Sequence, residues 1–347
     1  MKRILTILAI LTCATLRAQD VTDAQQAAAA AAQAISEAPK EEVAAPKPVY
    51  WTKSLMTNIN FGQTALWNWA AGGYNNYTLA GYIDANANYA KDKMVWNNRL
   101  QLDYGFLYSQ DKPILQKNKD RIYLESKWGY DTPIKHLKYS ASFDFKTQFD
   151  TNWDYKTPAS DGSTEPTRED WLAARSLKSA LLSPAYMNLG LGVLWTPKPW
   201  LSVNFAPVTG GLVVVEDPRL RKTYGMELFD ATITDPVGSD YRPVRFEFGA
   251  QLKIDAGFQI NDNFSYTTQL ALFYNYLTPK VEPRINWDNK VFWKLAKFFA
   301  LTLSTNLIYD PLVKIDINKD GVVEEKGVQF KEFLEFGFSW TIATKAK

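Results

Sequence analysis

The stretch that decides the fold is PVRFEFGAQLKIDAGFQI, residues 243–260. Apolar residues occupy every second position from Val244 to Ile260, and charged residues, amides or glycine stand between them. A period of two is that of a β-strand with one apolar and one polar face. The run exceeds the roughly 5–6 residues of a typical globular strand and is long enough for the roughly 9–11 tilted residues that span a bilayer. It predicts one strand of a transmembrane barrel, apolar outward and polar inward.

The same alternation recurs along the chain. It is clear in residues 77–89, 94–108, 121–130, 138–149, 187–195, 301–309 and 334–342, and weaker in 53–62, 199–208, 264–278 and 284–295. These segments predict an all-β fold: a closed, antiparallel, outer-membrane type β-barrel of about twelve strands within residues 50–343. A soluble β-sandwich is the alternative, but it would leave about twelve half-charged faces outside.

The connections between these segments alternate in length, which is an independent indication. Short ones are expected at 91–93, 131–136, 197–199, 261–263 and 296–298, and long ones at 62–73, 109–119, 150–183, 208–243 and 311–327. Outer-membrane barrels combine short periplasmic turns with long outside loops. An even strand number also returns both ends to the periplasm.

The first eighteen residues predict a signal peptide, with Lys2 and Arg3 before an apolar run and cleavage after Ala18. Lipidation at Cys13 is the alternative, although Thr12 precedes it where a small residue is usual. Cleavage would change the formal charge from +2 to −1 and remove the only cysteine. We therefore expect no disulfide, zinc cluster or cysteine nucleophile, and no nucleic-acid partner.

Residues 19–49 differ in composition, being rich in Ala and Gln and then in Pro. We expect a periplasmic segment and linker, acting as a tether or as a helix that docks on a partner. No later run of about 18 apolar residues predicts a membrane helix. The 12 Trp, 18 Tyr and 19 Phe suit the aromatic girdles of a barrel. The expected location is the outer membrane of a Gram-negative bacterium, with the N-terminus periplasmic; outer-membrane lipid, the barrel-insertion machinery and envelope proteins are the expected partners.

Charged residues on the polar faces should point into the barrel. They are Arg99, Asp103, Arg121, Glu125, Lys127, Asp144, Lys146, Arg245, Glu247, Lys253 and Asp255. One interpretation is a polar channel whose mixed charges select solutes. The other is an internal salt-bridge network that fills a barrel of intermediate size.

The sharpest local motif is DINKDGVVEE at 316–325, which resembles the opening of a calcium loop. Its expected ligands are Asp316, Asn318, Asp320, the Val322 carbonyl and Glu324. The twelfth position is Gly327 rather than Glu, so calcium would be weakly bound and no other cofactor is expected. A metal-free Asx-rich turn is the alternative.

Two further features concern chemistry and the loops. His136 is the only histidine and falls in a predicted short turn, so no Ser–His site is indicated and we expect no enzyme. In the loop at 150–183, Thr167 and Asp170 resemble a capping box opening a helix of about three turns. Such a helix could cover a pore mouth or lie on the surface with no gating role.

Several phrases resemble a known family. They are NFGQTALWNWAAGGYNNYTLAGYIDANANY, TQFD, LLSPAYMNLGLGVLWTP, NFAPVTG, LSTNLIYD and VQFKEFLEFGFSW. Together they resemble the Bacteroidota family catalogued as domain of unknown function 3078, over roughly residues 51–343. The resemblance implies an exported outer-membrane barrel and brings no established activity. We expect a narrow channel for small polar solutes or, alternatively, a non-conducting structural or adaptor barrel.

Overall fold

The computed structural model describes residues 49–67, 74–159, 166–278, 281–315, 317 and 326–343. The predicted signal peptide and all but the last residue of the 19–49 segment lie outside these ranges. Across the described ranges, no helix has the length and apolar character needed to cross a membrane.

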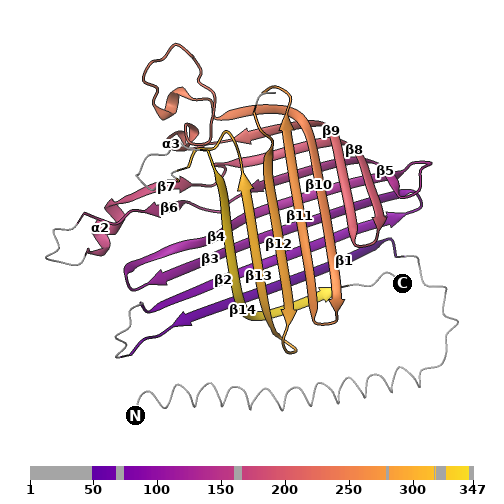
Figure 1. Cartoon of the computed structure of the whole chain (residues 1–347), viewed down its shortest axis with the longest axis horizontal. Coiled ribbons are helices and arrows are strands. Elements are labelled where there is room, and N and C mark those ends of the chain that lie inside the picture. The colour runs from indigo at the N-terminus through magenta and orange to yellow at the C-terminus, as the bar shows by residue number, and fades with distance from the viewer. Residues whose placement is uncertain are drawn as a thin grey trace. The chain divides into compact units, whose positions relative to one another are not determined.

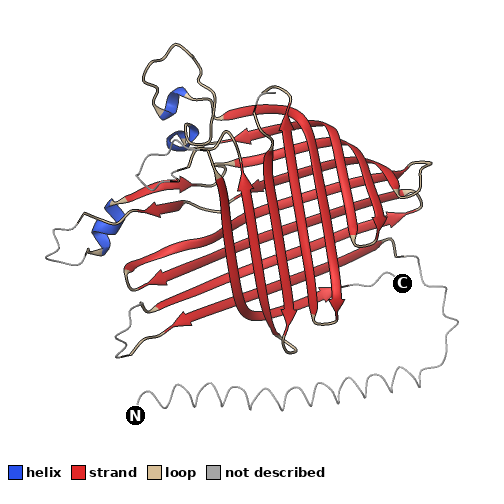
Figure 2. Ribbon diagram, viewed as in Figure 1, coloured by secondary structure: helices blue, strands red, loops and turns tan. Residues whose placement is uncertain are grey.

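Twelve strands form a closed antiparallel barrel, which confirms the predicted fold and strand number (Figures 1 and 2). Around the wall the order is β1-β14-β13-β12-β11-β10-β9-β8-β5-β4-β3-β2. The bounds are β1 Trp51–Thr64, β2 Asn76–Lys91, β3 Met94–Ser109, β4 Lys112–Asp131, β5 Leu137–Thr147, β8 Ala185–Lys198, β9 Leu201–Val214, β10 Val244–Asn261, β11 Phe264–Asn275, β12 Arg284–Lys294, β13 Phe299–Tyr309 and β14 Val328–Ala343.

The remaining elements lie in two connections. The one between β5 and β8 carries the hairpin of β6 (Asn152–Tyr155) and β7 (Arg175–Ser179), with helix α2 (Arg168–Ala173) between them. The one between β9 and β10 carries α3 (Pro218–Arg221) and the 3₁₀ turn η1 (Gly238–Asp240). Both lie at the end of the barrel opposite the short turns. We call these two ends the loop end and the short-turn end.

The wall is inverted relative to a soluble protein. In β10, Phe246 is 58% exposed while the next residue, Glu247, is 2% exposed. Further along the strand Gln251 and Lys253 are again buried, and the apolar residues between buried positions are more open. Period two therefore places the apolar face outside and the polar face inside. This arrangement suits hydrocarbon around the barrel and a polar interior.

Exposed aromatic side chains gather on the outer wall beside the short turns. They include Trp96, Trp128, Tyr130, Tyr139, Trp195, Trp200, Trp293 and Trp340. They come from the turn-side ends of many strands, so they form a belt at one level. Rings with a polar edge favour the interface between bilayer and water. The belt marks the level of one such interface.

The barrel is closed by β1 and β14, which pair over seven residues, Ser54 to Asn60 on β1. Every other neighbouring pair of barrel strands is longer: β1 and β2, for example, pair over fourteen residues, and β3 pairs with β4 from Met94 to Ser109. We call the β1–β14 pairing the seam. It is the shortest stretch of strand pairing in the wall.

One predicted loop is wrong. Residues 109–119 were expected to form a long connection, but β3 and β4 are joined by a tight turn at 110–111, and β4 starts at Lys112. The polar run DKPILQKNKD continues the strand because the barrel interior pairs its charges. Lys117 is bonded to Asp120, and Lys119 to Glu335 of β14. Figure 1 shows β2, β3 and β4 extending on the side that carries β6, α2 and β7.

Two other expectations need correction. Strand β9 runs to Val214, so the connection expected at 208–243 spans 215–243. The capping box is present: the Thr167 hydroxyl accepts from the Asp170 amide, and the Asp170 carboxylate accepts from the Thr167 amide. The Asp170 carboxylate accepts hydrogen bonds from the Thr167 hydroxyl and from the Thr167 amide, and these two bonds hold the pKa of Asp170 below its usual value. The helix is only six residues long, because Arg175–Ser179 pairs with β6 as a strand instead of continuing it.

Candidate functional site

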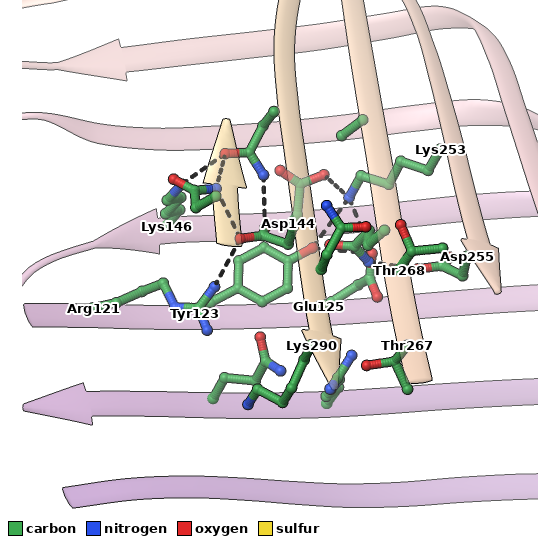
Figure 3. A pocket seen from close by; sticks show the side chains of 18 of the residues that line it. Arg121, Tyr123, Glu125, Asp144, Lys146, Lys253, Asp255, Thr267, Thr268 and Lys290 are labelled. Atoms are coloured by element: carbon green, nitrogen blue, oxygen red, sulfur yellow. Dashed lines mark hydrogen bonds and ion pairs between the residues drawn. The ribbon is translucent and has the colours of Figure 1, made fainter. Parts of the chain in front are cut away.

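The barrel encloses a cavity of about 1160 Å³. Its lining reaches from His136 and Lys198 beside the short turns to Lys178 and Asp310 at the loop end. Nine of the eleven predicted lumen residues line it: Arg99, Asp103, Arg121, Glu125, Lys127, Asp144, Lys146, Lys253 and Asp255. Figure 3 shows several of them converging from strands on different sides of the lumen.

Lys253 of β10 makes the most deeply buried cross-lumen contact. Its Nζ lies 3.0 Å from Oε1 of Glu125 on β4 and 2.6 Å from Oδ1 of Asp144 on β5. Gln251 and Asn188 donate to the two Asp144 carboxylate oxygens at 3.3 Å and 2.8 Å. Charges removed from water require this many partners, since desolvation otherwise outweighs the attraction.

A second bridge joins the same two sides of the barrel nearer the short turns. Nζ of Lys127 on β4 is 2.7 Å from Oδ2 of Asp255 on β10 and 3.2 Å from Oε2 of Glu125. Gln269 donates to the other Asp255 oxygen at 2.6 Å. Since β4 and β10 are four places apart around the wall, these bridges cross the lumen and narrow it.

The inward residues of β12 meet the opposite wall in a row. Asn286 accepts from Lys146 Nζ of β5 at 3.3 Å, and Asp288 lies 3.9 Å from Nη1 of Arg121 on β4. Lys290 places its Nζ 3.5 Å from the centre of the Tyr82 ring on β2. In the strand order β12 stands six places from β4. Side chains therefore reach across the full width of the lumen here.

Other ion pairs stay on one wall and orient these side chains. Arg99 Nη2 lies 2.6 Å from Asp84, which also accepts from Tyr82 at 2.8 Å. Arg121 Nε lies 2.8 Å from Asp103. These pairs lie between neighbouring strands, so they leave the cavity open while fixing the position of its charged groups.

Arg245 and Glu247 do not belong to the cavity lining. They are buried together, with Nη2 of Arg245 3.0 Å from Glu247 Oε1. Arg284, which does line the cavity, binds both Glu247 oxygens at 3.3 and 3.0 Å. Nη1 of Arg245 turns to the loop end and donates to the carbonyls of Tyr224 and Gly225. These contacts tie the inner face of β10 to residues 224–225 of the loop that follows β9.

That loop, residues 215–243, packs at the loop end of the cavity. It packs with the end of β9 in an apolar cluster made of Val213, Val215, Leu220, Met226 and Tyr241. Tyr224 lines the cavity, and burial raises the pKa of its phenol to about 12, so it stays neutral. The amide of Lys314 donates to the carbonyl of Thr223 at 3.1 Å, which ties the loop to the β13–β14 connection.

The predicted calcium ligands, Asp316, Asn318, Asp320, Val322 and Glu324, lie outside the described residues. Within the described part of the chain, no cluster of three or more His, Cys, Asp or Glu residues could hold a metal ion. His136 lies exposed in its turn at φ 64° and lines the short-turn end of the cavity.

Several lumen residues were missed from the sequence, chiefly on β12. Arg284, Asn286, Asp288 and Lys290 alternate with apolar or polar outward residues, so the period-two signal was present. Asn289 interrupts the apolar outer face of this strand, so the alternation in this segment is faint. The sequence gives no sign of the Lys119–Glu335 bridge, because the polar pattern of residues 109–119 is typical of a loop.

Comparison with known proteins gives a family match over part of the chain. A family model described as "Protein of unknown function (DUF3078)" matches residues 61–153. No curated protein matches the chain.

Solved structures of outer-membrane barrels are similar to this chain. The COG4313 outer membrane channel from Pseudomonas putida F1 is 12% identical, with 88% of this chain and 100% of that chain covered and a TM-score of 0.35. The translocator domain of autotransporter NalP from Neisseria meningitidis is 9% identical, with 92% and 97% covered and a TM-score of 0.35. The Pseudomonas putida toluene transporter TodX is 11% identical, with 86% and 90% covered and a TM-score of 0.29. These likenesses concern the fold.

Proposed function

We propose that this protein is a narrow outer-membrane channel that passes small polar solutes through its barrel, with no catalytic role. The observation that carries the proposal is the cavity of about 1160 Å³, whose polar and charged lining includes residues beside both ends of the barrel. Solute would move among the charged groups listed above, and the cross-lumen bridges would set the width. The apolar outer wall and its aromatic belt would sit in outer-membrane lipid, with the short turns and N-terminus periplasmic.

A non-conducting structural or adaptor barrel is the second candidate. The bridges from Lys253 and Lys127 favour it, because they join strands three or four places apart with short, largely buried ion pairs. In this case the bridges would serve as internal struts and the loops as docking surfaces for envelope proteins.

Single-channel recording with a cysteine placed in the lumen separates the two. Ser304 lies on β13 opposite Lys290 and lines the cavity, whereas Ser176 lies on β7 and does not. The barrel itself contains no cysteine. We expect discrete conductance steps from purified protein in a planar bilayer. A negatively charged methanethiosulfonate should reduce the steps of Ser304→Cys and leave those of Ser176→Cys unchanged.

Folded protein is verified by its heat-modifiable migration in gel electrophoresis before each recording. Steps that the reagent leaves unchanged in Ser304→Cys would place the conducting path outside this lumen. If bilayers that contain verified folded barrel show no conductance steps, the channel is rejected and the structural barrel remains. Cross-linking in the envelope would then identify its partner proteins.

A further inference from the structure

The charges along the cavity are not paired evenly. All eight acidic side chains in the lining have a basic nitrogen within 4.0 Å. The lining holds eleven lysines and arginines, and among the described residues five of these have no carboxylate within that distance. They are Lys146, Lys178, Lys198, Lys290 and Lys331. The acids are neutralised, so the charge that remains for a solute is positive.

Three of the five lysines contact neutral groups inside the barrel. Lys146 Nζ donates to the Asn286 amide oxygen at 3.3 Å, and Lys331 Nζ to the Asn118 carbonyl at 3.0 Å. Lys290 rests on the face of the Tyr82 ring. Neutral partners hold an ammonium in place without cancelling its charge, so each keeps its attraction for an anion.

The five lysines are spread along the cavity rather than gathered at one mouth. Lys178 and Lys331 lie toward the loop end, and Lys198 ends β8 at the short turns. Lys146 and Lys290 lie between them. Lys146 contacts Asn286 of β12, and Lys290 is four residues further along the same strand.

We propose that the lumen selects small anions, inorganic or carboxylate, and that Lys146, Lys290 and Lys331 form its selective section. This inference rests on the proposed channel and names its solute class. A cation entering the cavity finds every carboxylate already bound to an ammonium or guanidinium. An anion can exchange its water for lysine ammonium groups without breaking an ion pair. Low dielectric surroundings strengthen that difference.

The test is the reversal potential of purified protein in a planar bilayer under a potassium chloride gradient. We expect the wild-type potential to be displaced toward the chloride equilibrium value. The variant Lys146→Gln/Lys290→Gln/Lys331→Gln should lose that displacement. The matched control is Lys91→Gln/Lys93→Gln/Lys297→Gln, which removes three exposed turn lysines that do not line the cavity and should behave as wild type.

A second measurement does not need conduction. Inorganic phosphate is titrated calorimetrically into the folded barrel in neutral detergent, and we expect heat that the lumen triple variant loses and the control retains. Conducting protein with no chloride preference, or a preference that survives the lumen triple variant, overturns the inference while the channel stands. If the protein does not conduct but binds phosphate with heat that depends on the three lysines, the channel is rejected and the anion-binding site is supported. Silent protein without such heat rejects both.

Discussion

At the scale of single residues, the most consequential side chain is Glu247. It is the largest side chain with almost no exposure, and it accepts from Arg245 and from both terminal nitrogens of Arg284. One carboxylate thus compensates two guanidinium groups taken out of water. The gain from each bond is modest, whereas leaving a buried charge unpaired is costly.

We therefore predict that Glu247→Ala lowers the free energy of unfolding by about 3–5 kcal/mol, because Arg245 and Arg284 lose their shared partner. The free energy of unfolding of Glu247→Gln should lie between those of wild type and Glu247→Ala, since the amide oxygen still accepts one hydrogen bond. Tryptophan fluorescence during guanidinium unfolding of the lipid-reconstituted barrel measures both. The control is Glu227→Ala, an exposed loop glutamate. Equal effects at 227 and 247 would contradict the anchoring role.

Glu247 and its partner Arg245 also show what the sequence can and cannot predict about single residues. Alternation was sufficient to place Glu247 and Arg245 on the inner face, and both are inside the wall. Alternation could not tell that the loop 215–243 folds down and caps Arg245 with two carbonyls. That contact joins parts of the chain about twenty residues apart through tertiary packing, for which the local pattern carries no signal.

At the scale of elements, the 215–243 loop is held by backbone geometry as well as by Arg245. Gly225 has φ +63°, and a Cβ there would lie 2.5 Å from the carbonyl oxygen of Leu312 in the neighbouring connection. Only glycine fits, because the left-handed conformation disfavours a side chain and the close approach to Leu312 excludes one. The two connections meet at this point.

Gly225→Ala should therefore separate the 215–243 loop from the β13–β14 connection. We predict faster trypsin cleavage at Arg219, Arg221 or Lys222 of the intact barrel, with the twelve strands still resistant. Gel analysis over a digestion time course measures it. The control is Gly81→Ala, where a Cβ meets nothing within 4 Å. An unchanged cleavage rate in Gly225→Ala would show that the loop does not depend on this contact.

Strand β4 illustrates a misreading at the element scale. Lysines, Asp and Pro in 109–119 are typical of a loop in water, and the sequence favoured one. Inside a barrel, however, the same lysines can bond to acids of another strand, as Lys119 does with Glu335 more than two hundred residues later. The local sequence does not show this partner, so the pattern predicts a start for β4 that is about nine residues too late.

At the scale of the whole molecule, the apolar outer wall determines where the barrel is stable. Leu334 lies in the middle of β14 and is 65% exposed. In lipid the exposure of an apolar side chain is favourable, whereas a charged side chain at this position is unfavourable. We predict that Leu334→Lys lowers the free energy of unfolding in vesicles by about 2–4 kcal/mol, the usual cost near the bilayer midplane.

The matched control is Leu181→Lys, at a leucine that is 53% exposed in the connection before β8. It lies outside the barrel strands, so the same substitution should change stability little. Guanidinium titration of both variants in the same vesicles gives the comparison. A similar loss at both positions would argue against a bilayer around the strands.

The fold of the whole molecule was predictable because alternation is repeated about twelve times and each repeat supports the others. The candidate site was predictable only as a set of inward positions. Which of its charges remain unpaired depends on bridges such as Lys127–Asp255, set by barrel closure and register. No single strand encodes them.

The seam has a consequence for how the chain is held closed. Most strand pairings in the wall join consecutive strands through a short connection, so re-forming one costs little chain entropy. The β1–β14 pairing joins residues 54–60 to 337–343 and closes a loop of nearly the whole barrel with the fewest paired residues. It combines the greatest closure entropy with the fewest hydrogen bonds. Thermal fluctuation should therefore unzip the cylinder there first, and amide protons of the facing β1 and β14 edges should exchange ahead of those in every hairpin.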